Sequence, residues 1–257
     1  MRSLWNGAIS FGLINIPIKI YSAAVDHRLN FDLLDKNDHQ RIRYKRVNEK
    51  SGKEIPYEEI VKGYKIEDKY VIINNDDFDR ANMKKSKTID LEEFVKEDEV
   101  ADFLFKKPYY LEPAKGGSKS YTLLRNALEK SKKLGVATFV MRNKEHLCLI
   151  GTHKKALILH DIRFGVEIRD VTDLKLPNSK VSKKEEDMAL NLIEQYTEKF
   201  KVNKYKDEYT DQLLNIIEEK SKGIEKEPEK FDVKPTAAKD LMAKLKASLE
   251  NKKSKAG

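Results

Sequence analysis

The chain has 257 residues, of which 37 % are charged, and its formal net charge is +8. This balance favours a polyanionic partner such as nucleic acid or an acidic membrane surface. The single cysteine, Cys148, excludes an intrachain disulfide and a thiolate-based metal site, and it is typical of a reducing compartment. No apolar run approaches the roughly 20 residues of a membrane span, and polar residues interrupt the N-terminal apolar stretch, so we expect a cytoplasmic protein outside the membrane.

The N-terminal part of the chain contains three predicted strands. Residues 8–21 predict one strand whose apolar residues change parity next to Gly12, which indicates a bulge or sharp bend of the kind found where a sheet closes into a barrel. Residues 69–77 predict a second strand, which an Asn/Asp turn stops, and residues 86–95 alternate apolar and polar side chains like a third. Residues 106–118 predict a loop.

The middle of the chain predicts one helix followed by four short strands. The helix is expected at residues 118–135, where four side chains fall at helical spacing and Gly135 occupies the position of a C-terminal cap. Many short strands with one inserted helix favour a barrel-like α+β domain. The four side chains at helical spacing are Tyr121, Leu124, Leu128 and Ser131. The four strands are expected at 136–142, 145–153, 155–163 and 165–171.

The character of the sequence changes near Lys180, after which two amphipathic helices are predicted. The first, at 182–200, opens with Ser182 and Glu185 in capping-box spacing, and the second is expected at 205–223. Neither apolar stripe has an obvious partner nearby, so both helices are expected to dock on the barrel or on another subunit. The rest of the chain predicts a flexible charged linker with one amphipathic patch and a basic end.

Motifs for catalysis and metal binding are missing from the sequence. There is no glycine-rich phosphate loop and no nucleophile in a strand-turn-helix context. Three histidines lie near Cys148, but their spacing fits no standard metal site, and all four are interpreted as ordinary strand residues. The acidic run 74–79 lacks the ligand positions of a calcium loop and is interpreted as the start of a helix. The three histidines are His146, His153 and His160.

Residues 41–66 predict a ribbon that turns at Ser51 and Gly52 and contains few strongly apolar side chains. If residues 41–46 are extended, alternate side chains point to opposite faces. One face then carries three cations and the opposite face carries an isoleucine and a tyrosine. The cationic face consists of Arg41, Arg43 and Lys45, opposite Ile42 and Tyr44.

Two interpretations of this ribbon stay open from the residues alone. The local pattern favours a solvated edge hairpin whose cations prevent edge-to-edge aggregation. The alternative is a surface for a phosphate backbone, and its contacts would be independent of sequence because the polar side chains that read base edges are missing. Two other classes are also weighed: a basic regulator that binds internal DNA sites, and a nucleic-acid-processing enzyme with clustered carboxylates.

Several segments, in their order and spacing, closely resemble bacterial Ku proteins over roughly residues 2–223. A patch at 240–250 also resembles one in the C-terminal tails of many such proteins. Many bacterial relatives have two cysteines near the turn of the ribbon, where this chain reads VNEKSG at 47–52, so no metal or thiol role is expected there. The segments that carry the resemblance are 4–23, 41–64, 85–95, 107–117 and 207–220.

The resemblance implies an α+β fold with a Ku-core β-barrel over residues 1–180, an extended bridge ribbon at about 38–68, and a C-terminal helical arm at 181–224. A flexible basic tail with a short amphipathic patch would follow at 225–257. Two copies would form a dimeric ring that threads onto the end of double-stranded DNA without catalysis or cofactors. The family acts in non-homologous end joining and recruits an ATP-dependent DNA ligase, which implies a cytoplasmic, nucleoid-associated homodimer.

The resemblance also implies candidate site residues. The cations of the bridge would face phosphates inside the ring, and apolar side chains of the tail patch would bind a partner protein. No catalytic or metal-binding residue is expected. The candidate DNA-binding residues are Arg41, Arg43, Lys45, Arg46, Lys50, Lys53, Lys62 and Lys65. The candidate partner-binding residues are Leu241, Leu245 and Leu249.

Overall fold

The computed structural model describes residues 1–82, 87–224, 240 and 242–248. The chain forms two compact units, Met1–Val171 and Thr172–Gly257, each with its own internal contacts. Within the described residues, no helix is both long enough and apolar enough to cross a bilayer.

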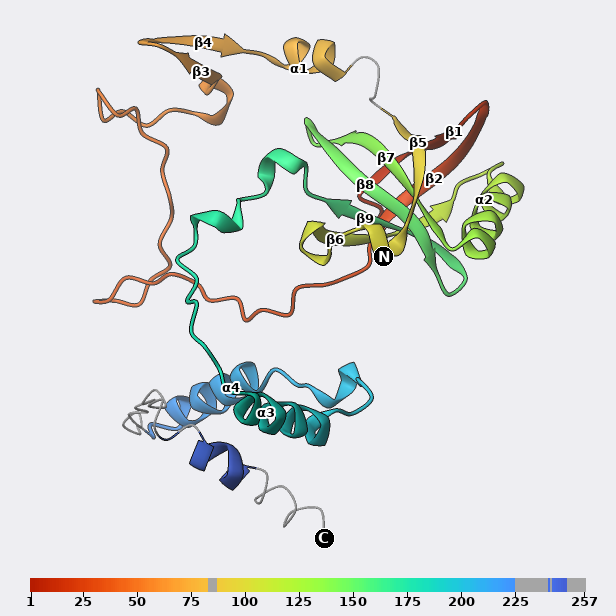
Figure 1. Ribbon diagram of the computed structural model, residues 1–257. Coiled ribbons are helices and arrows are strands. Elements are labelled where there is room, and N and C mark those ends of the chain that lie inside the picture. The colour runs from red at the N-terminus through yellow and green to blue at the C-terminus, as the bar shows by residue number, and fades with distance from the viewer. Residues whose placement is uncertain (83–86, 225–239, 241, 249–257) are drawn as a thin grey trace. The chain divides into compact units, whose positions relative to one another are not determined.

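Seven strands of the first unit close into a barrel in the order β1-β2-β6-β9-β8-β7-β5 (Figure 1). All neighbouring strands are antiparallel except β1 and β5, whose parallel pairing closes the barrel. Closure removes the sheet edges at which another chain could pair. The strands are β1 (Trp5–Phe11), β2 (Ile14–Ser22), β5 (Thr88–Lys96), β6 (Phe105–Pro113), β7 (Lys133–Met141), β8 (Lys144–His153) and β9 (Ala156–Ile162).

The first two strands form a tight hairpin, so the expectation of one strand at 8–21 is wrong. Gly12 and Leu13 make the two-residue turn, and Gly12 has a φ of +57°, which glycine adopts without the steric cost of a Cβ atom. In the hairpin register Ile9 pairs with Ile16, and both are buried. The change of parity therefore marks a reversal of the chain and not a bulge.

The hydrophobic core lies inside the barrel and under helix α2 (Ser118–Ser131), which packs against β2, β7 and β8. Phe139, near the C-terminal end of β7, is fully buried. The hydroxyl of Tyr121 on α2 donates to the carbonyl oxygen of Leu111 (2.7 Å) and accepts from the amide nitrogen of Leu157 (2.8 Å). Because its hydroxyl has both partners, the buried tyrosine ties α2 to two strands without an unsatisfied polar atom.

The helix ends at Ser131, four residues before the expected cap, and Ser131 is exposed. Lys132 forms the C-terminal cap with a φ of 53°. Gly135 lies inside β7, where a Cβ atom would come within 2.3 Å of the Cδ2 atom of Leu91. Gly135 therefore makes room for the Leu91 side chain of the neighbouring strand and does not end the helix.

Strand β6 replaces the loop that was expected at 106–118. Tyr109 and Leu111 alternate with less buried neighbours, as in a strand with one face in the core. Pro108 follows an irregularity in the register between β6 and β9, where a residue without an N–H group is tolerated. The two prolines of this strand therefore led to the prediction of a loop.

The strand expected at 165–171 is also wrong, because Gly165–Glu167 forms a 3-10 turn. The carboxylate of Glu167 accepts from the amide nitrogen of Phe164 (2.9 Å) and from Nζ of Lys106 (2.7 Å). The turn is thus fixed to β6 by polar contacts. The other 3-10 turns of the described residues are Tyr57–Glu59, Glu97–Glu99, Asp102–Leu104, Val171–Asp173 and Val202–Lys204.

A long insertion, residues 23–87, separates β2 from β5 and is described except for residues 83–86. It contains an antiparallel hairpin of β3 (Lys62–Ile66) and β4 (Lys69–Ile73), followed by helix α1 (Asn75–Asn82). The helix start predicted at 74–79 is confirmed: the Asn74 side chain accepts from the amide of Asp77, and the Asp77 carboxylate accepts from the amide of Asn74 (both 3.0 Å).

Both helices predicted after Lys180 are present in the second unit, each shorter than predicted. The capping box of Ser182 and Glu185 is confirmed, and the carboxylate of Asp207 caps the following helix by accepting from the amide of Thr210 (3.0 Å). Residues 242–248 are helical as well. The two helices are α3 (Lys183–Tyr196) and α4 (Glu208–Ser221).

Candidate nucleic-acid interface

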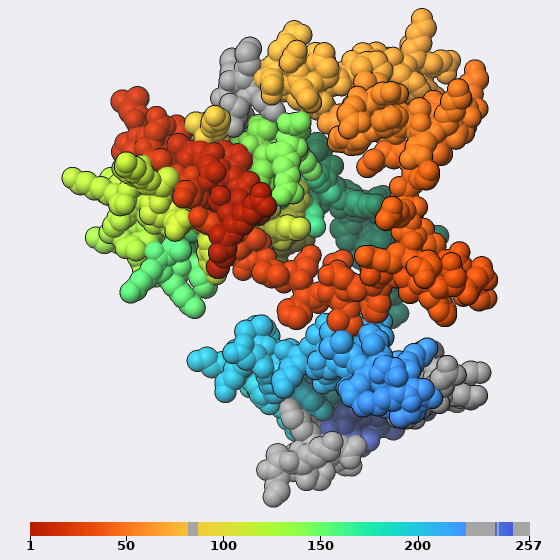
Figure 2. Space-filling model, turned by 180° about the vertical axis from the view of Figure 1, so that it is seen from behind, coloured from red at the N-terminus to blue at the C-terminus, as the bar shows by residue number. Residues whose placement is uncertain are grey.

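In its described residues the insertion has no hydrophobic core of its own. No residue between 23 and 81 is buried. Ile42 is 49 % exposed and Tyr44 is 82 % exposed, so the predicted apolar side of the ribbon covers nothing. In Figure 2 the orange chain of the insertion consists of thin segments, whereas the barrel strands and α2 pack into a solid body. Hydrophobic burial therefore does not explain the conformation of the insertion.

The predicted turn at Ser51 and Gly52 is confirmed. The side-chain oxygen of Asn48 accepts from the amide nitrogen of Ser51 (2.9 Å), and the amide of Asn48 donates to the carbonyl oxygen of Lys53 (2.8 Å). Gly52 has a φ of +67°. An asparagine that bonds to the backbone two or three residues ahead, followed by a glycine with positive φ, fixes the turn from local sequence alone.

The ribbon expected over 41–66 is paired only next to its turn. There Val47 bridges Glu54, and the amide of Ile55 donates to the carbonyl oxygen of Arg46 (2.9 Å), while a second isolated bridge joins Leu34 and Arg41. Strand β3 pairs with β4 and not with residues 41–46. Pro56, which lacks an N–H group, and the 3-10 turn that follows it separate the two parts of the insertion.

The candidate DNA-binding side chains are all exposed. Between Arg41 and Lys65 the chain carries eight cations and four carboxylates. Arg41 pairs with Asp32, and Nζ of Lys45 lies 2.7 Å from Oε2 of Glu54. Exposed ion pairs contribute only about 0–1 kcal/mol, so both cations can exchange these carboxylates for phosphates at little cost.

Two further candidates lie over aromatic rings. The guanidinium of Arg46 is 5.1 Å from the ring centroid of Tyr57, and Nζ of Lys62 is 4.6 Å from that of Phe78. Such contacts position a cation while leaving its outer side free for an anion. The four remaining candidates have no ion pair among the described residues: Arg43, Lys50, Lys53 and Lys65.

The candidate partner-binding leucines of the tail fall partly outside the described residues. Leu245 lies in the helical stretch 242–248 and is half-buried. Leu241 and Leu249 lie outside the described residues. The role of these three side chains stays a prediction.

Helices α3 and α4 contain no buried residue. Ile193 and Tyr196 on α3 and Tyr209 and Ile217 on α4 are exposed. Apolar side chains exposed in this number on one unit are typical of a surface that another chain covers.

Nothing in the described residues resembles a catalytic or metal centre. No three side chains of His, Cys, Asp or Glu gather there closely enough to hold a metal ion. Nδ1 of His146 lies 3.2 Å from the buried carboxylate of Asp161, and the thiol of Cys148 donates to the carbonyl of Ala137 (3.3 Å). Burial raises the pKa of the Cys148 thiol, so this cysteine is an inert core residue.

A closed β-barrel that carries a long exposed insertion, with eight cations and four carboxylates at 41–65, defines a class of binding proteins that present charge on an insertion held by a rigid scaffold. The family model described as the Ku70/Ku80 beta-barrel domain matches residues 10–189. The chain therefore belongs to the Ku family, and the expected α+β Ku-core barrel is confirmed.

Several relatives match over most of their length, and each is named "Non-homologous end joining protein Ku". The protein from Opitutus terrae is 44 % identical over 86 % of this chain and 80 % of its own. The protein from Archaeoglobus fulgidus is 36 % identical over 97 % of this chain and 99 % of its own. The protein from Coxiella burnetii is 35 % identical over 98 % and 95 %.

Proposed function

We propose that this chain is a non-catalytic protein that binds the ends of double-stranded DNA and acts in double-strand break repair by non-homologous end joining. The observation that carries the proposal is its membership of the Ku family, with relatives named for this process that the chain matches over 80 % and 99 % of their length. Within the described residues, the exposed segment 41–65 carries an excess of cations that suits the same function.

The insertion supplies the chemistry for binding without sequence preference. Its cations are exposed, and they are either solvated or held by weak contacts. Arginine and lysine side chains neutralise phosphates, and residues 41–46 contain no asparagine or glutamine for reading adenine edges. Each phosphate contact contributes a slope of about −0.9 to the dependence of log K on log salt concentration, so affinity falls steeply as salt rises.

Two copies form a ring that threads onto a duplex end. A closed ring cannot pass onto DNA without an end, so topology gives the preference for ends that phosphate contacts alone cannot give. The exposed apolar side chains of α3 and α4 support this homodimer, because a second copy would bury side chains that are exposed within the described part of one chain.

The ring recruits an ATP-dependent DNA ligase to the end that it protects. The amphipathic patch around Leu245 is the segment assigned to this contact. A DNA-end-binding protein without a membrane-spanning helix in its described residues fits a cytoplasmic, nucleoid-associated location.

A competition experiment tests the threading model. The full chain is titrated into three DNAs of equal length: a linear duplex, the same duplex with both ends blocked by streptavidin, and a closed circle. We expect tight binding to the linear duplex only. Blocked ends and circles should compete at least tenfold less well, because neither offers an entrance to the ring.

Equal affinity for all three DNAs would contradict end threading and would favour a protein that binds internal sites. Cleavage or ligation of the linear duplex by the pure chain would contradict the non-catalytic assignment. A matched titration at several salt concentrations separates phosphate binding from threading, because salt weakens binding to every DNA in proportion to the phosphates contacted.

A further inference from the structure

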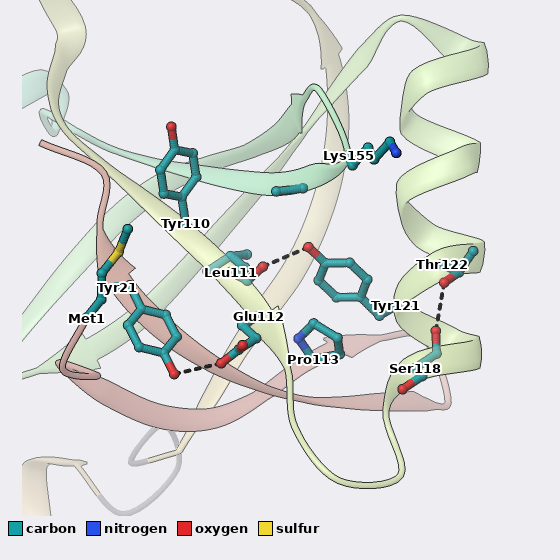
Figure 3. Close-up of a pocket in the computed structure, with 11 residues that line it drawn as sticks. Met1, Tyr21, Tyr110, Leu111, Glu112, Pro113, Ser118, Tyr121, Thr122 and Lys155 are labelled. Carbon is teal, nitrogen blue, oxygen red and sulfur yellow. Dashed lines mark hydrogen bonds between the residues drawn. The ribbon is translucent and has the colours of Figure 1, made fainter.

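A groove of about 620 Å³ lies on the barrel between α2 and strands β2, β6 and β9 (Figure 3). None of the residues that line it belongs to the insertion or to the helical arm, to which the proposed function assigns DNA binding and dimerisation. Its walls come from both the sheet and the helix. Among the residues that line it are Tyr21, Tyr110, Pro113, Ser118, Thr122 and Lys155.

Hydrogen bonds hold the walls of the groove in place. The hydroxyl of Tyr121, bonded to Leu111 and Leu157, fixes α2 against β6 and β9. The hydroxyl of Tyr21 donates to the carboxylate of Glu112 (2.6 Å) and so orients the tyrosine ring (Figure 3). A site whose side chains are already ordered loses little conformational entropy when a ligand enters.

The groove offers an aromatic and apolar surface. Tyr21 and Tyr110 are directly opposite each other across β2 and β6, and both are only partly covered. Pro113 and Ala156 extend this surface toward the helix. Tyrosine rings with accessible faces are enriched where one protein anchors an apolar side chain of another.

The surroundings of the groove are cationic. Lys155 lines it, and the guanidinium of Arg125 donates to the carbonyl oxygen of Lys155 (3.2 Å), which places a second cation beside it. Lys119 lies in the first turn of α2, and Lys19 is directly opposite Glu112 across β2 and β6. Among the described residues, neither Lys119 nor Lys155 has an ion pair, so the positive field extends over the groove.

We propose that this groove binds a short segment of a partner protein in which an aliphatic or aromatic anchor is flanked by carboxylates. The anchor enters between Tyr21 and Tyr110, and the carboxylates meet Lys155, Lys119 and Arg125. Glu112 favours a peptide over a nucleic-acid strand, because a strand would bring a phosphate against its carboxylate whereas a peptide can offer a backbone N–H. This inference does not depend on DNA binding by the insertion.

Fluorescence anisotropy with the full chain tests the proposal. The probe is a fluorescein-labelled octapeptide, DEELFDEE, compared with DEEGSDEE, which lacks the anchor, and KKKLFKKK, which inverts the flanking charge. A labelled single-stranded dT octamer is the nucleic-acid arm. We expect the first peptide to bind at least tenfold more tightly than the other three probes.

Variants locate the binding. Lys155→Glu and Tyr110→Ala should each weaken DEELFDEE at least tenfold, and the far-ultraviolet circular dichroism spectrum should show an intact fold. Matched controls are Lys133→Glu and Tyr70→Ala, which make the same changes outside the groove and should leave the affinity unchanged. Because Lys155 is exposed, Lys155→Glu tests the charge requirement even if Tyr110→Ala destabilises the barrel.

Three outcomes would overturn the proposal. The first is absence of binding by the acidic anchored peptide. The second is equal binding of that peptide by the groove variants and the wild type. The third is a dT octamer that binds as tightly as the peptide and loses affinity in the same variants, which would assign the groove to single-stranded nucleic acid.

Discussion

The barrel and the insertion belong to one chain, but different interactions determine their conformations. In the barrel, Ile9, Ile89 and Phe139 are fully buried, and the strands close on themselves. In the insertion no residue between 23 and 81 is buried, and local turns, isolated bridges and one short hairpin hold the chain. The barrel obtains its conformation from hydrophobic burial, whereas the insertion obtains its conformation from hydrogen-bonded turns.

Binding energy can come only from groups whose contacts are not already made within the fold. A side chain in the barrel core is surrounded by other core residues, so it has no accessible surface that a partner could contact. The cations of the insertion have only weak contacts, with Arg41 and Lys45 in exposed ion pairs. Their strongest interactions remain available for a polyanion.

The largest expected effect is on the stability of the barrel. Phe139→Ala removes a fully buried ring that packs edge-on against Trp5, with ring centroids 5.8 Å apart. We expect the free energy of unfolding to fall by about 3–5 kcal/mol in urea denaturation. The matched variant Tyr44→Ala, in the insertion, should change it by less than about 0.5 kcal/mol. Comparable losses in both variants would remove the contrast between the two regions.

A second prediction extends the comparison to the arm. Ile217 is 41 % exposed on α4, and in the proposed homodimer a second copy buries it. Ile217→Glu should weaken dimerisation at least thirtyfold in analytical ultracentrifugation, since loss of a central interface contact costs about 2 kcal/mol or more. Asn215→Glu, on the opposite side of the helix, is the control and should leave the dimer intact. A dimer that tolerates both changes would exclude this face of α4 as the interface.

A third prediction concerns close packing between strands. In Gly135→Ala the new Cβ atom would meet Cδ2 of Leu91 at 2.3 Å, so the Leu91 side chain or the strand has to shift. We expect a loss of about 1–3 kcal/mol in the free energy of unfolding. Gly165→Ala places the same methyl group in open space and serves as the control. Equal thermal stability of the two variants would show that the barrel is less rigid than its packing indicates.

A fourth prediction addresses the insertion directly. Arg43→Glu with Lys45→Glu should weaken binding to a linear duplex at least tenfold at 0.1 M salt and reduce the magnitude of the salt slope by about two. The unfolding transition should not move, because neither side chain is buried. The double variant Lys107→Glu with Lys133→Glu makes the same change of charge on exposed positions of the barrel strands. If both double variants lose affinity equally, net charge and not the insertion determines binding.

The smallest expected effect is a dependence of stability on pH. The hydrogen bond from Lys106 and that from the amide of Phe164 lower the pKa of Glu167 to about 2. A carboxylate whose folded pKa lies below its unfolded value near 4.5 stabilises the fold above pH 4.5, and this contribution is lost as pH falls from 4.5 toward 2. Glu167→Gln should therefore flatten the fall of melting temperature over this range. An unchanged profile would mean that other carboxylates account for the acid sensitivity.

The sequence predicted most of the barrel where apolar alternation was clean. The strands around Ile89, Phe139 and Leu149 match expected ranges, because a face buried against one core produces a period of two. The predicted elements were misplaced where glycine or proline is compatible with more than one local structure. Gly135 was assigned to a helix cap but serves a close approach, and Pro108 indicated a loop but lies in a strand.

The insertion was harder to predict because no core selects its pairing. Asn48, Ser51 and Gly52 specify their turn locally, and this turn was predicted correctly. The pairing of β3 with β4 instead of with residues 41–46 depends on a choice between weakly apolar segments, for which local sequence carries little signal. The groove beside α2 was missed because Tyr21, Tyr110 and Lys155 are far apart in sequence and only the barrel register brings them together.

The parallel pairing of β1 with β5 has a consequence for how the chain folds. Ile9 meets Ile89 across this seam, so the barrel closes only after the whole insertion has left β2 and returned. The entropy of closing so long a loop grows only with the logarithm of its length, so the length of the insertion adds little to the cost. Contacts between residues so distant in sequence nevertheless form slowly. We therefore expect docking of β5 beside β1 to be a late step in refolding, and variants that lengthen the insertion to fold at nearly the same rate.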